Sequence, residues 1–312
     1  MRAAKLYPKD RVVLREVGFR DGLQLVKQPP PTAQKKEWLN AEHAAGVRHF
    51  EVGSFLPVAR FPQFADVREM IDAVSALKDG FSSALALNER GAADALATGV
   101  DEIMFVVSAT EAHSQANTRR SRAEAVEMAA RINRRRLETG DTAPVFSTAI
   151  SMSFGCTLSG TVKPAEVLRL AEALAAAGSD MIALADTVGF AGPRQVAQMA
   201  REMRGVIGEI PVSMHFHDTR GLAIANCAAA LDNGVRILDG SLGGLGGCPF
   251  APGATGNVAF EDMAFLCQTM GFDTGIDIGM LADARTILER VLPDEPLHGA
   301  LAVWYRHLLE RI

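Results

Sequence analysis

Two histidines two positions apart are the clearest chemical feature of the sequence. His215 and His217 close an apolar run that begins at Val212. If this run is a β-strand, residues i and i+2 point to the same face, so both imidazoles face the same space. Two imidazoles on one face make half of a site for a divalent metal, but two hydrogen-bonded core histidines would give the same pattern. The pair alone does not choose between these interpretations.

Three further charged residues lie in or just after apolar runs. Asp21 offers the hard anionic oxygen that a divalent cation prefers. Arg20 beside it is either half of a surface ion pair, which would contribute little, or a guanidinium that faces a developing oxyanion. Glu51 is a charge inside the apolar run 50–53, where acids are seldom unpaired. It is therefore either paired to an arginine or a backbone amide, or a general acid/base that acts on substrate.

A glycine-rich segment with one thiol follows the last apolar run. It carries seven glycines between Gly240 and Asn257, with Cys248 among them. Its spacing fits neither a phosphate-binding P-loop nor a dinucleotide-binding turn. We expect either a mobile lid that brings Cys248 to a substrate, or a flexible loop with an incidental cysteine.

These residues follow predicted strands that alternate with helical patterns along the chain. The predicted strands are apolar on consecutive positions, as in a parallel sheet covered on both faces: Val12–Glu16, Phe50–Gly53, Ser83–Leu87, Ile103–Val107, Val145–Ser151, Met181–Ala185, Val212–His217 and Ile237–Ser241. Amphipathic stretches that end at glycine predict helices over 32–45, 89–98, 164–177 and 220–233. Eight strands in strict alternation favour a closed α/β barrel, the (β/α)8 TIM barrel, over an open doubly wound sheet.

The barrel hypothesis also predicts the domain organisation and the place of the site. We expect a single domain over 1–312, with the barrel at about 10–256 and extra C-terminal helices at about 257–312. The last helix, near 297–312, would pack on the barrel or form a dimer contact. Chemistry in such barrels sits at the carboxyl ends of the strands, which here would bring together Asp21, His215 and the pair Asp186-Thr187 after the sixth strand.

Composition excludes several classes of protein. The chain has 312 residues, 48% hydrophobic and 22% charged, with a net charge of −5 and no basic block, so we expect no nucleic-acid partner. It has no apolar run long enough to cross a bilayer, and too few residues before the first strand for a signal peptide. The four cysteines lack C-x-x-C spacing and form no disulfide framework, which favours a reducing, cytoplasmic setting.

Four motifs resemble one enzyme family. They are Glu16–Gln24, the His215-x-His-Asp218 element, Gly243–Pro249 and Gly256–Asp262. Together they resemble the 3-hydroxy-3-methylglutaryl-CoA lyases, a branch of a superfamily of metal-dependent lyases and Claisen synthases built on the same barrel. The likeness runs from about Val12 to past Asp262, and the cysteine-containing stretch is specific to the lyase branch.

The resemblance implies a role for each matching residue. It implies Mg²⁺ or Mn²⁺ as cofactor, with four metal ligands: Asp21, His215, His217 and Asn257. It implies that Arg20 holds the thioester carbonyl as it becomes an enolate and that Cys248 takes part in proton transfer. Further active-site or substrate-binding positions implied by the match are Gln24, Lys27, Glu51, Asp186, Thr187 and Glu261.

The implied reaction is a retro-Claisen cleavage of 3-hydroxy-3-methylglutaryl-CoA, or a close 3-hydroxyacyl-CoA, to acetyl-CoA and a keto acid. Asp21 or His215 would accept the hydroxyl proton, and Cys248 or a water would protonate the enolate. The partners implied are an acyl-CoA substrate and a second copy of the chain in a dimer. Two alternatives stay open: a Claisen-type synthase on the same barrel and an inactive CoA-ester-binding paralogue.

Some residues depart from the family's pattern. They are Phe19, Leu25-Val26, Ala59-Arg60 and Arg220. We expect all of them near the mouth of the barrel, where the acyl group or CoA would sit. The expected metal ligands are unchanged, so the departures bear on the choice of substrate more than on the type of reaction.

Overall fold

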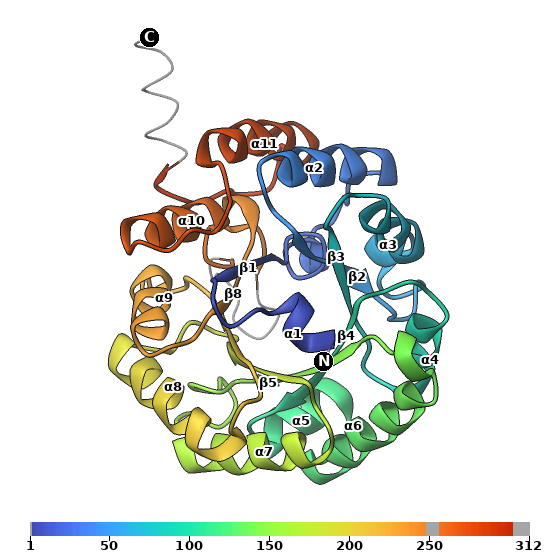
Figure 1. Cartoon of the computed structure of the whole chain (residues 1–312), viewed down its shortest axis with the longest axis vertical. Helices are drawn as coiled ribbons and strands as arrows, with labels where there is room; N and C mark the ends of the chain where they lie inside the picture. Colours follow the sequence, from blue (N-terminus) through green and yellow to red (C-terminus); the bar gives the residue numbers. More distant parts are fainter. Residues whose placement is uncertain (1, 248–255, 302–312) are drawn as a thin grey trace.

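Eight parallel strands form one closed barrel in sequence order (Figure 1). The computed structural model describes residues 2–247 and 256–301. The strands are β1 Val13–Glu16, β2 His49–Ser54, β3 Phe81–Leu85, β4 Glu102–Ser108, β5 Val145–Ser151, β6 Met181–Asp186, β7 Val212–Phe216 and β8 Ile237–Gly240. Each predicted strand overlaps an observed one, and the pairing of β8 with β1 closes the barrel. The TIM-barrel prediction is confirmed.

A ring of helices surrounds the barrel (Figure 1). The helices are α1 Arg2–Leu6, α2 Thr32–Ala44, α3 Val67–Ser75, α4 Glu89–Leu96, α5 Glu111–Thr118, α6 Arg122–Leu137, α7 Pro164–Ala176, α8 Pro193–Ile207, α9 Ala223–Asp232, α10 Phe260–Thr269 and α11 Ile278–Val291. The predicted helix over 220–233 begins three residues late, at Ala223. Gly221 has a positive φ of 69°, and Asp218 accepts a hydrogen bond from the Ala223 N–H, so a turn precedes the helix.

One end of the barrel is covered by the amino-terminal segment. Leu6 and Tyr7, at the end of α1 and just beyond it, pack against Val13, Val145 and Ile237, which belong to the first residues of their strands. In Figure 1, α1 lies over the centre of the ring. The opposite end, where the strands finish, is therefore the one that is left for a ligand.

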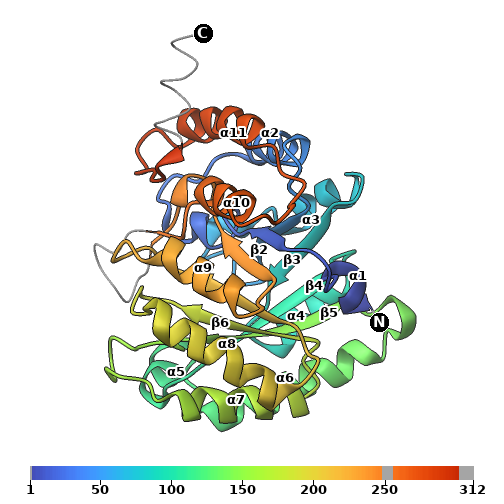
Figure 2. The same cartoon turned by 60° about the vertical axis from the view of Figure 1, so that its left-hand side comes forward.

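Two helices follow the eighth strand. α10 lies between α9 and α11, so it takes the place of the helix after β8 in the ring, and α11 packs beside α2 (Figure 2). Of the C-terminal helices expected over 257–312, α11 is thus the one that is additional to the barrel repeat. Most of the helix expected near 297–312 lies outside the described residues.

A buried carboxyl pair joins the first strand to the first outer helix. Glu16 on β1 and Glu42 on α2 are fully buried, and their carboxyl groups interact electrostatically. Burial raises the pKa of Glu16 to about 8, and burial together with the charge of Glu16 raises that of Glu42. The pair therefore holds a proton at neutral pH. Glu16 also accepts hydrogen bonds from the N–H groups of Gly18 and Leu242.

Candidate active site

A cavity of about 370 Å³ opens among the carboxyl ends of the strands. Charged and polar residues from the first, seventh and eighth strands line one side of it, among them Arg20, Asp21, His215, His217 and Asp239. The floor and the other side are more apolar and come from β3 to β6. This is the end of the barrel at which the sequence predicts the chemistry.

Three side chains converge to form a candidate metal centre. The Nε2 atoms of His215 and His217 lie 3.1 Å apart. Asp21 Oδ2 lies 3.9 Å from Nε2 of His215 and 3.5 Å from Nε2 of His217. The ligand atoms all lie within 4.8 Å of one another, a grouping that could hold one ion. Because Asp21 lies beside both histidines, the structure favours a shared metal site over an isolated hydrogen-bonded pair of core histidines.

The local backbone explains this convergence. β7 ends at Phe216, so His215 and the residue two beyond it project to the same side. Asp21 is fixed in a tight turn after β1, where its N–H donates to the Val17 carbonyl at 2.7 Å. A chain reversal after β1 therefore turns the carboxylate back toward the seventh strand.

Asn257 joins the group through the return of the glycine-rich segment. It forms a β-bridge with His217, and the Val258 N–H donates to the Phe216 carbonyl at 3.0 Å. The Asn257 side-chain amide donates to Asp21 Oδ2 and to the Leu245 carbonyl, both at 3.0 Å. A Cβ on Gly246, whose φ is +135°, would lie 2.8 Å from that amide nitrogen. The glycine thus makes room for the asparagine.

The donor set fits a divalent cation. Within residues 2–247 and 256–301, the buried Asn257 Oδ1 and His217 Nδ1 atoms have no hydrogen-bond partner. A carboxylate, two imidazoles and an amide oxygen are ligands that Mg²⁺ or Mn²⁺ accepts. A buried polar atom without a partner is costly, and the unpaired amide oxygen of Asn257 is available as a ligand for an ion.

Arg20 is held against both carboxylates near it. Its Nε donates to Glu51 Oε1 at 2.7 Å and its Nη1 to Asp21 Oδ1 at 2.6 Å. Burial acts to raise the pKa of Asp21, but the Arg20 charge and a hydrogen bond with His217 outweigh it and hold that pKa well below its usual range. Glu51 does not line the cavity, and burial raises its pKa despite Arg20. An arginine partner, one of the alternatives left open for Glu51, is therefore present, and this pairing orients Arg20.

Sequence reasoning missed two residues that support His215. Asp239 on β8 approaches His215 Nδ1 at 3.4 Å, and Arg15 on β1 grips Asp239 with two hydrogen bonds of 2.7 and 2.9 Å. Burial acts to raise the pKa of Asp239, but Arg15 and His215 hold it at about 2. Burial acts to lower the pKa of His215, but Asp239 and Asp21 raise it. The signal was available: Asp239 is a lone charge inside an apolar strand, as Glu51 is, and Arg15 lies beside Glu16 within the apolar run that begins at Val12.

The Arg15 network continues to the far end of the barrel. Arg15 Nη1 donates to Glu102 Oε1 at 3.2 Å. Glu102, at the start of β4, also accepts hydrogen bonds from the hydroxyls of Tyr7 and Ser147. A continuous polar chain therefore crosses the barrel interior from α1 to the candidate metal ligands.

The other predicted site residues fall into two groups. Gln24 and Thr187 line the cavity. Three others do not: Asp186 accepts hydrogen bonds from the N–H groups of Phe190 and Ala191, Glu261 pairs with Arg285 and the Gly243 N–H, and Lys27 is exposed. Asp186 and Glu261 thus hold the loops that frame the site. Cys248 lies outside the described residues.

We expected all of the residues that depart from the family pattern to lie near the mouth of the barrel, but some of them do not. Phe19 is buried and stacks on Trp38 at 3.9 Å between ring centroids, so it belongs to the core. Arg220 lies over the Phe190 ring at 4.1 Å and does not line the cavity. Arg60 does line it. The expectation is thus wrong for Phe19, because the chain turns inward after β1.

Comparison with known proteins gives the family. The HMGL-like family model matches residues 11–288. The chain belongs to the hydroxymethylglutaryl-CoA lyase family, a family of carbon–carbon lyases. A hydroxymethylglutaryl-CoA lyase of Bacillus subtilis is 34% identical over 283 residues, which are 91% of this chain and 93% of the relative.

Two more relatives show what else the family contains. An (R)-citramalyl-CoA lyase of Chloroflexus aurantiacus is 36% identical, over 91% of this chain and 92% of that protein. A crystal structure of an HMG-CoA lyase from Acinetobacter baumannii, in complex with coenzyme A and 3-methylmalate, superposes with a TM-score of 0.86 and 34% identity, covering 95% of each chain. The family thus includes members named for more than one acyl-CoA, so membership fixes the reaction class more closely than the acyl group.

Proposed function

We propose that this chain cleaves 3-hydroxy-3-methylglutaryl-CoA, or a close 3-hydroxyacyl-CoA analogue, to acetyl-CoA and a keto acid. The observation that carries the proposal is the grouping of Asp21, His215, His217 and Asn257 beside Arg20 at the mouth of the barrel. The family relatives and the coenzyme A complex of one of them support a CoA-ester substrate. No comparable grouping of metal-binding side chains occurs elsewhere in the described residues.

The same four residues would hold Mg²⁺ or Mn²⁺. The hard oxygens of Asp21 and Asn257 suit either ion, and the two imidazoles are compatible with both. A divalent ion bound there supplies Lewis-acid catalysis, which lowers the pKa of a substrate hydroxyl. Asp239 and Arg15 fix the ring of His215, so the site is preorganised before the ion binds.

The chain's own residues account for the remaining chemistry. The hydroxyl proton passes to Asp21 or His215, the basic groups that line the cavity. The carbon–carbon bond then breaks, the former hydroxyl carbon becomes the carbonyl of the keto acid, and the electron pair enters the thioester as an enolate. Arg20, held in place by Glu51, stabilises the enolate oxygen. A proton from Cys248 or from water completes acetyl-CoA.

We also propose that the protein works in the cytoplasm as a homodimer. The free thiols of Cys156, Cys227 and Cys267 agree with a reducing compartment. Along residues 2–247 and 256–301, no helix has the length and hydrophobicity needed to span a bilayer. Phe265 on α10 and Met280 on α11 are exposed apolar side chains on neighbouring helices, a surface suited to a second copy. Light scattering after gel filtration measures the mass.

The test of the activity is turnover of several 3-hydroxyacyl-CoAs with Mg²⁺ or Mn²⁺, followed by mass detection of products. We expect release of acetyl-CoA and a keto acid that a chelator abolishes. Incubation of acetyl-CoA with 2-oxo acids is the control. If free CoA is released in that incubation and no 3-hydroxyacyl-CoA is cleaved, the protein is a Claisen synthase and not a lyase. Tight metal binding with no turnover of any ester would favour a binding protein.

A further inference from the structure

One sector of the cavity carries positive charge that the proposed reaction does not use. It is formed by the loops after β2, β3 and β4, which are neighbours in the barrel. Arg60 comes from the first of these loops, Asn88 from the second and Arg120 from the third, and all three line the cavity. The candidate metal ligands Asp21, His215 and His217 lie after the first strand and at the end of the seventh, on another part of the rim.

Arg120 is held at the cavity but is not neutralised. Its Nη1 donates to the Leu87 carbonyl at 3.1 Å, which fixes the guanidinium and leaves its other N–H groups for a ligand. Among the described residues it forms no ion pair with a carboxylate. Glu124 interacts with the charge of Arg120 at longer range, but its carboxylate accepts hydrogen bonds from the N–H and the hydroxyl of Ser121.

Arg60 provides a second cation on the same sector. Its guanidinium lies 5.4 Å from the centre of the Phe61 ring, and Phe61 also lines the cavity. The described part of the chain gives Arg60 no carboxylate partner. Stacking on an aromatic ring places a guanidinium while leaving its N–H edge free.

The cavity's own carboxylates do not cancel these charges. Asp21 is paired with Arg20 and Asp239 with Arg15. Apolar side chains also line the cavity, among them Leu85, Met104 and Ala149, which belong to one cluster. A ligand that fills the cavity thus meets the candidate metal ligands, an apolar surface and two guanidinium groups.

We propose that Arg120 and Arg60 form a subsite that binds an anionic group of the substrate. The inference rests on the proposed function, and it assigns specificity to two residues outside the metal centre. The anion is either the free carboxylate of the acyl chain or a phosphate of CoA, since guanidinium groups bind both with paired hydrogen bonds. Arg120 is the principal contact, because its guanidinium is already fixed and half-buried.

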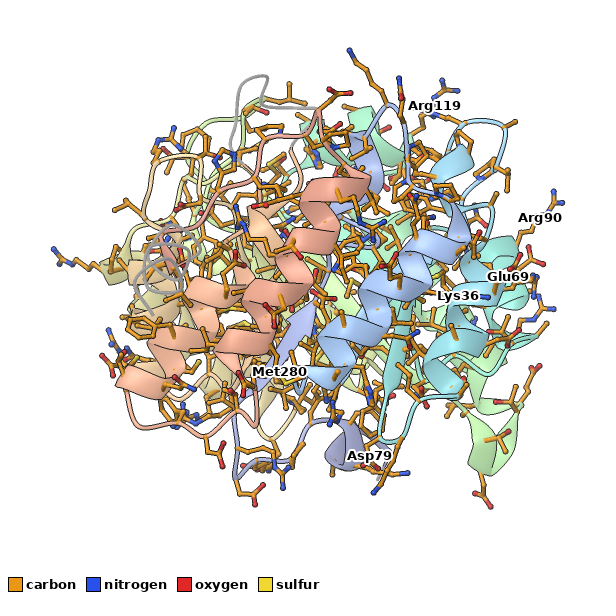
Figure 3. All side chains as sticks on the ribbon, turned by 90° about the horizontal axis from the view of Figure 1, so that it is seen from above. Lys36, Glu69, Asp79, Arg90, Arg119 and Met280 are labelled. Carbon is orange, nitrogen blue, oxygen red and sulfur yellow. The ribbon has the colours of Figure 1, made fainter. Side chains whose placement is uncertain are left out.

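The test compares Arg120→Met and Arg60→Met with a matched control, Arg119→Met. Arg119 is the adjacent residue, is exposed, and points into solvent at the edge of the molecule in Figure 3. KM and kcat are measured for 3-hydroxy-3-methylglutaryl-CoA and for its N-acetylcysteamine thioester, which has no phosphate. We expect Arg120→Met to raise KM for the CoA ester about 10- to 100-fold, the usual loss of a hydrogen-bonded charge, with little change in kcat.

The two thioesters identify the anion. A KM increase with both means that Arg120 binds the acyl carboxylate, and an increase with the CoA ester alone means that it binds a phosphate. Arg120→Lys keeps the charge and should recover part of the loss. Equal KM values for Arg120→Met and Arg119→Met with both thioesters would overturn the subsite.

Failure of the subsite can be told apart from failure of the lyase proposal. Calorimetric titration with CoA and with free 3-hydroxy-3-methylglutarate measures binding without turnover. If the wild-type chain cleaves no ester, weaker binding of either ligand by Arg120→Met than by Arg119→Met still supports the subsite. Equal binding of both ligands by the two variants overturns it. Manganese affinity should be unchanged in both, which separates this effect from damage to the metal centre.

Discussion

His217 is the residue whose removal most directly tests the metal centre. Its Nε2 faces both His215 and Asp21, and it is buried. We expect His217→Ala to lower manganese affinity by at least about 100-fold. Mutation of a residue that only supports a metal ligand already lowers metal affinity by about 10- to 100-fold. Equilibrium dialysis with metal analysis measures this. Manganese retained at the wild-type affinity would remove His217 from the ligand set; His113→Ala, a change at a buried histidine outside that set, is the control.

Asp239 contacts a candidate metal ligand, His215. It orients the His215 ring and is itself held by Arg15. We expect Asp239→Asn to weaken metal binding by about 10- to 100-fold, because the amide supports the imidazole less well than the carboxylate does. The melting temperature is recorded alongside, since Arg15 loses one buried partner but keeps Glu102. A lower melting temperature with normal manganese affinity would make Asp239 purely structural.

The glycine-rich segment is the element on which the position of Asn257 depends. A Cβ at Gly246 would meet the Asn257 amide nitrogen at 2.8 Å. We expect Gly246→Ala to displace Asn257 and to reduce both metal affinity and turnover. Gly271→Ala is the matched control, because Gly271 also has a positive φ, of 82°, but a Cβ there has no atom within 4 Å. A Cβ at either position also strains the backbone, at a cost on the order of 1–3 kcal/mol, so equal metal affinities would contradict the close-contact argument.

The carboxyl pair between β1 and α2 makes stability depend on pH. Glu16 has a pKa of about 8 in the folded state, and that of Glu42 is also raised, whereas both are near 4.5 when unfolded. The stabilisation is complete below that lower value and is lost as pH rises toward 8, because the unfolded carboxyls ionise in this range while the folded pair keeps its proton. We expect Glu42→Gln to flatten this decline. Urea unfolding from pH 5 to pH 9 checks it, and a variant that declines as steeply as wild type would rule the pair out as the cause.

The fold could be predicted from the sequence at the scale of the element. Consecutive apolar positions and glycine helix stops predict eight strands in order, and each is observed. Local sequence patterns do not predict contacts that depend on how the strands pair or how a loop closes. The grip of Arg15 on Asp239 requires β1 and β8 to be neighbours, which the sequence does not encode locally. The burial of Phe19 against Trp38 likewise depends on how the turn after β1 meets α2.

The candidate site was predictable in part. The spacing of His215 and His217 and the position of Asp21 point to an ion, and the structure brings the three together. Asn257 entered through a family resemblance, because nothing in a glycine-rich stretch indicates that its end returns to pair with β7. For Glu261 the same resemblance implies an active-site role, which stays a prediction; the structure shows that its carboxylate pairs with Arg285.

For the whole molecule, metal binding and folding should be linked. Two of the four expected ligands, Asp21 and Asn257, are more than 230 residues apart in the chain. The four come together only in the folded state, so an ion that they bind stabilises that state alone. We expect manganese at about 100 times its dissociation constant to add about 2.7 kcal/mol, which raises the melting temperature by several degrees. Thermal melts with manganese and with a chelator measure this shift. His217→Ala should show little of it, and an equal shift in that variant would place the ion elsewhere.

The polar chain through the barrel has a practical consequence for how the enzyme is handled. Tyr7 beside α1 bonds Glu102, which contacts Arg15, and Arg15 reaches the imidazole of His215 by way of Asp239. A peptide tag fused ahead of α1 therefore lies at one end of this polar chain, and the other end of the chain orients the imidazole of His215. Recombinant protein should have such a tag cleaved off before ion affinities are compared, because a disturbed amino terminus would resemble a defect of the catalytic centre.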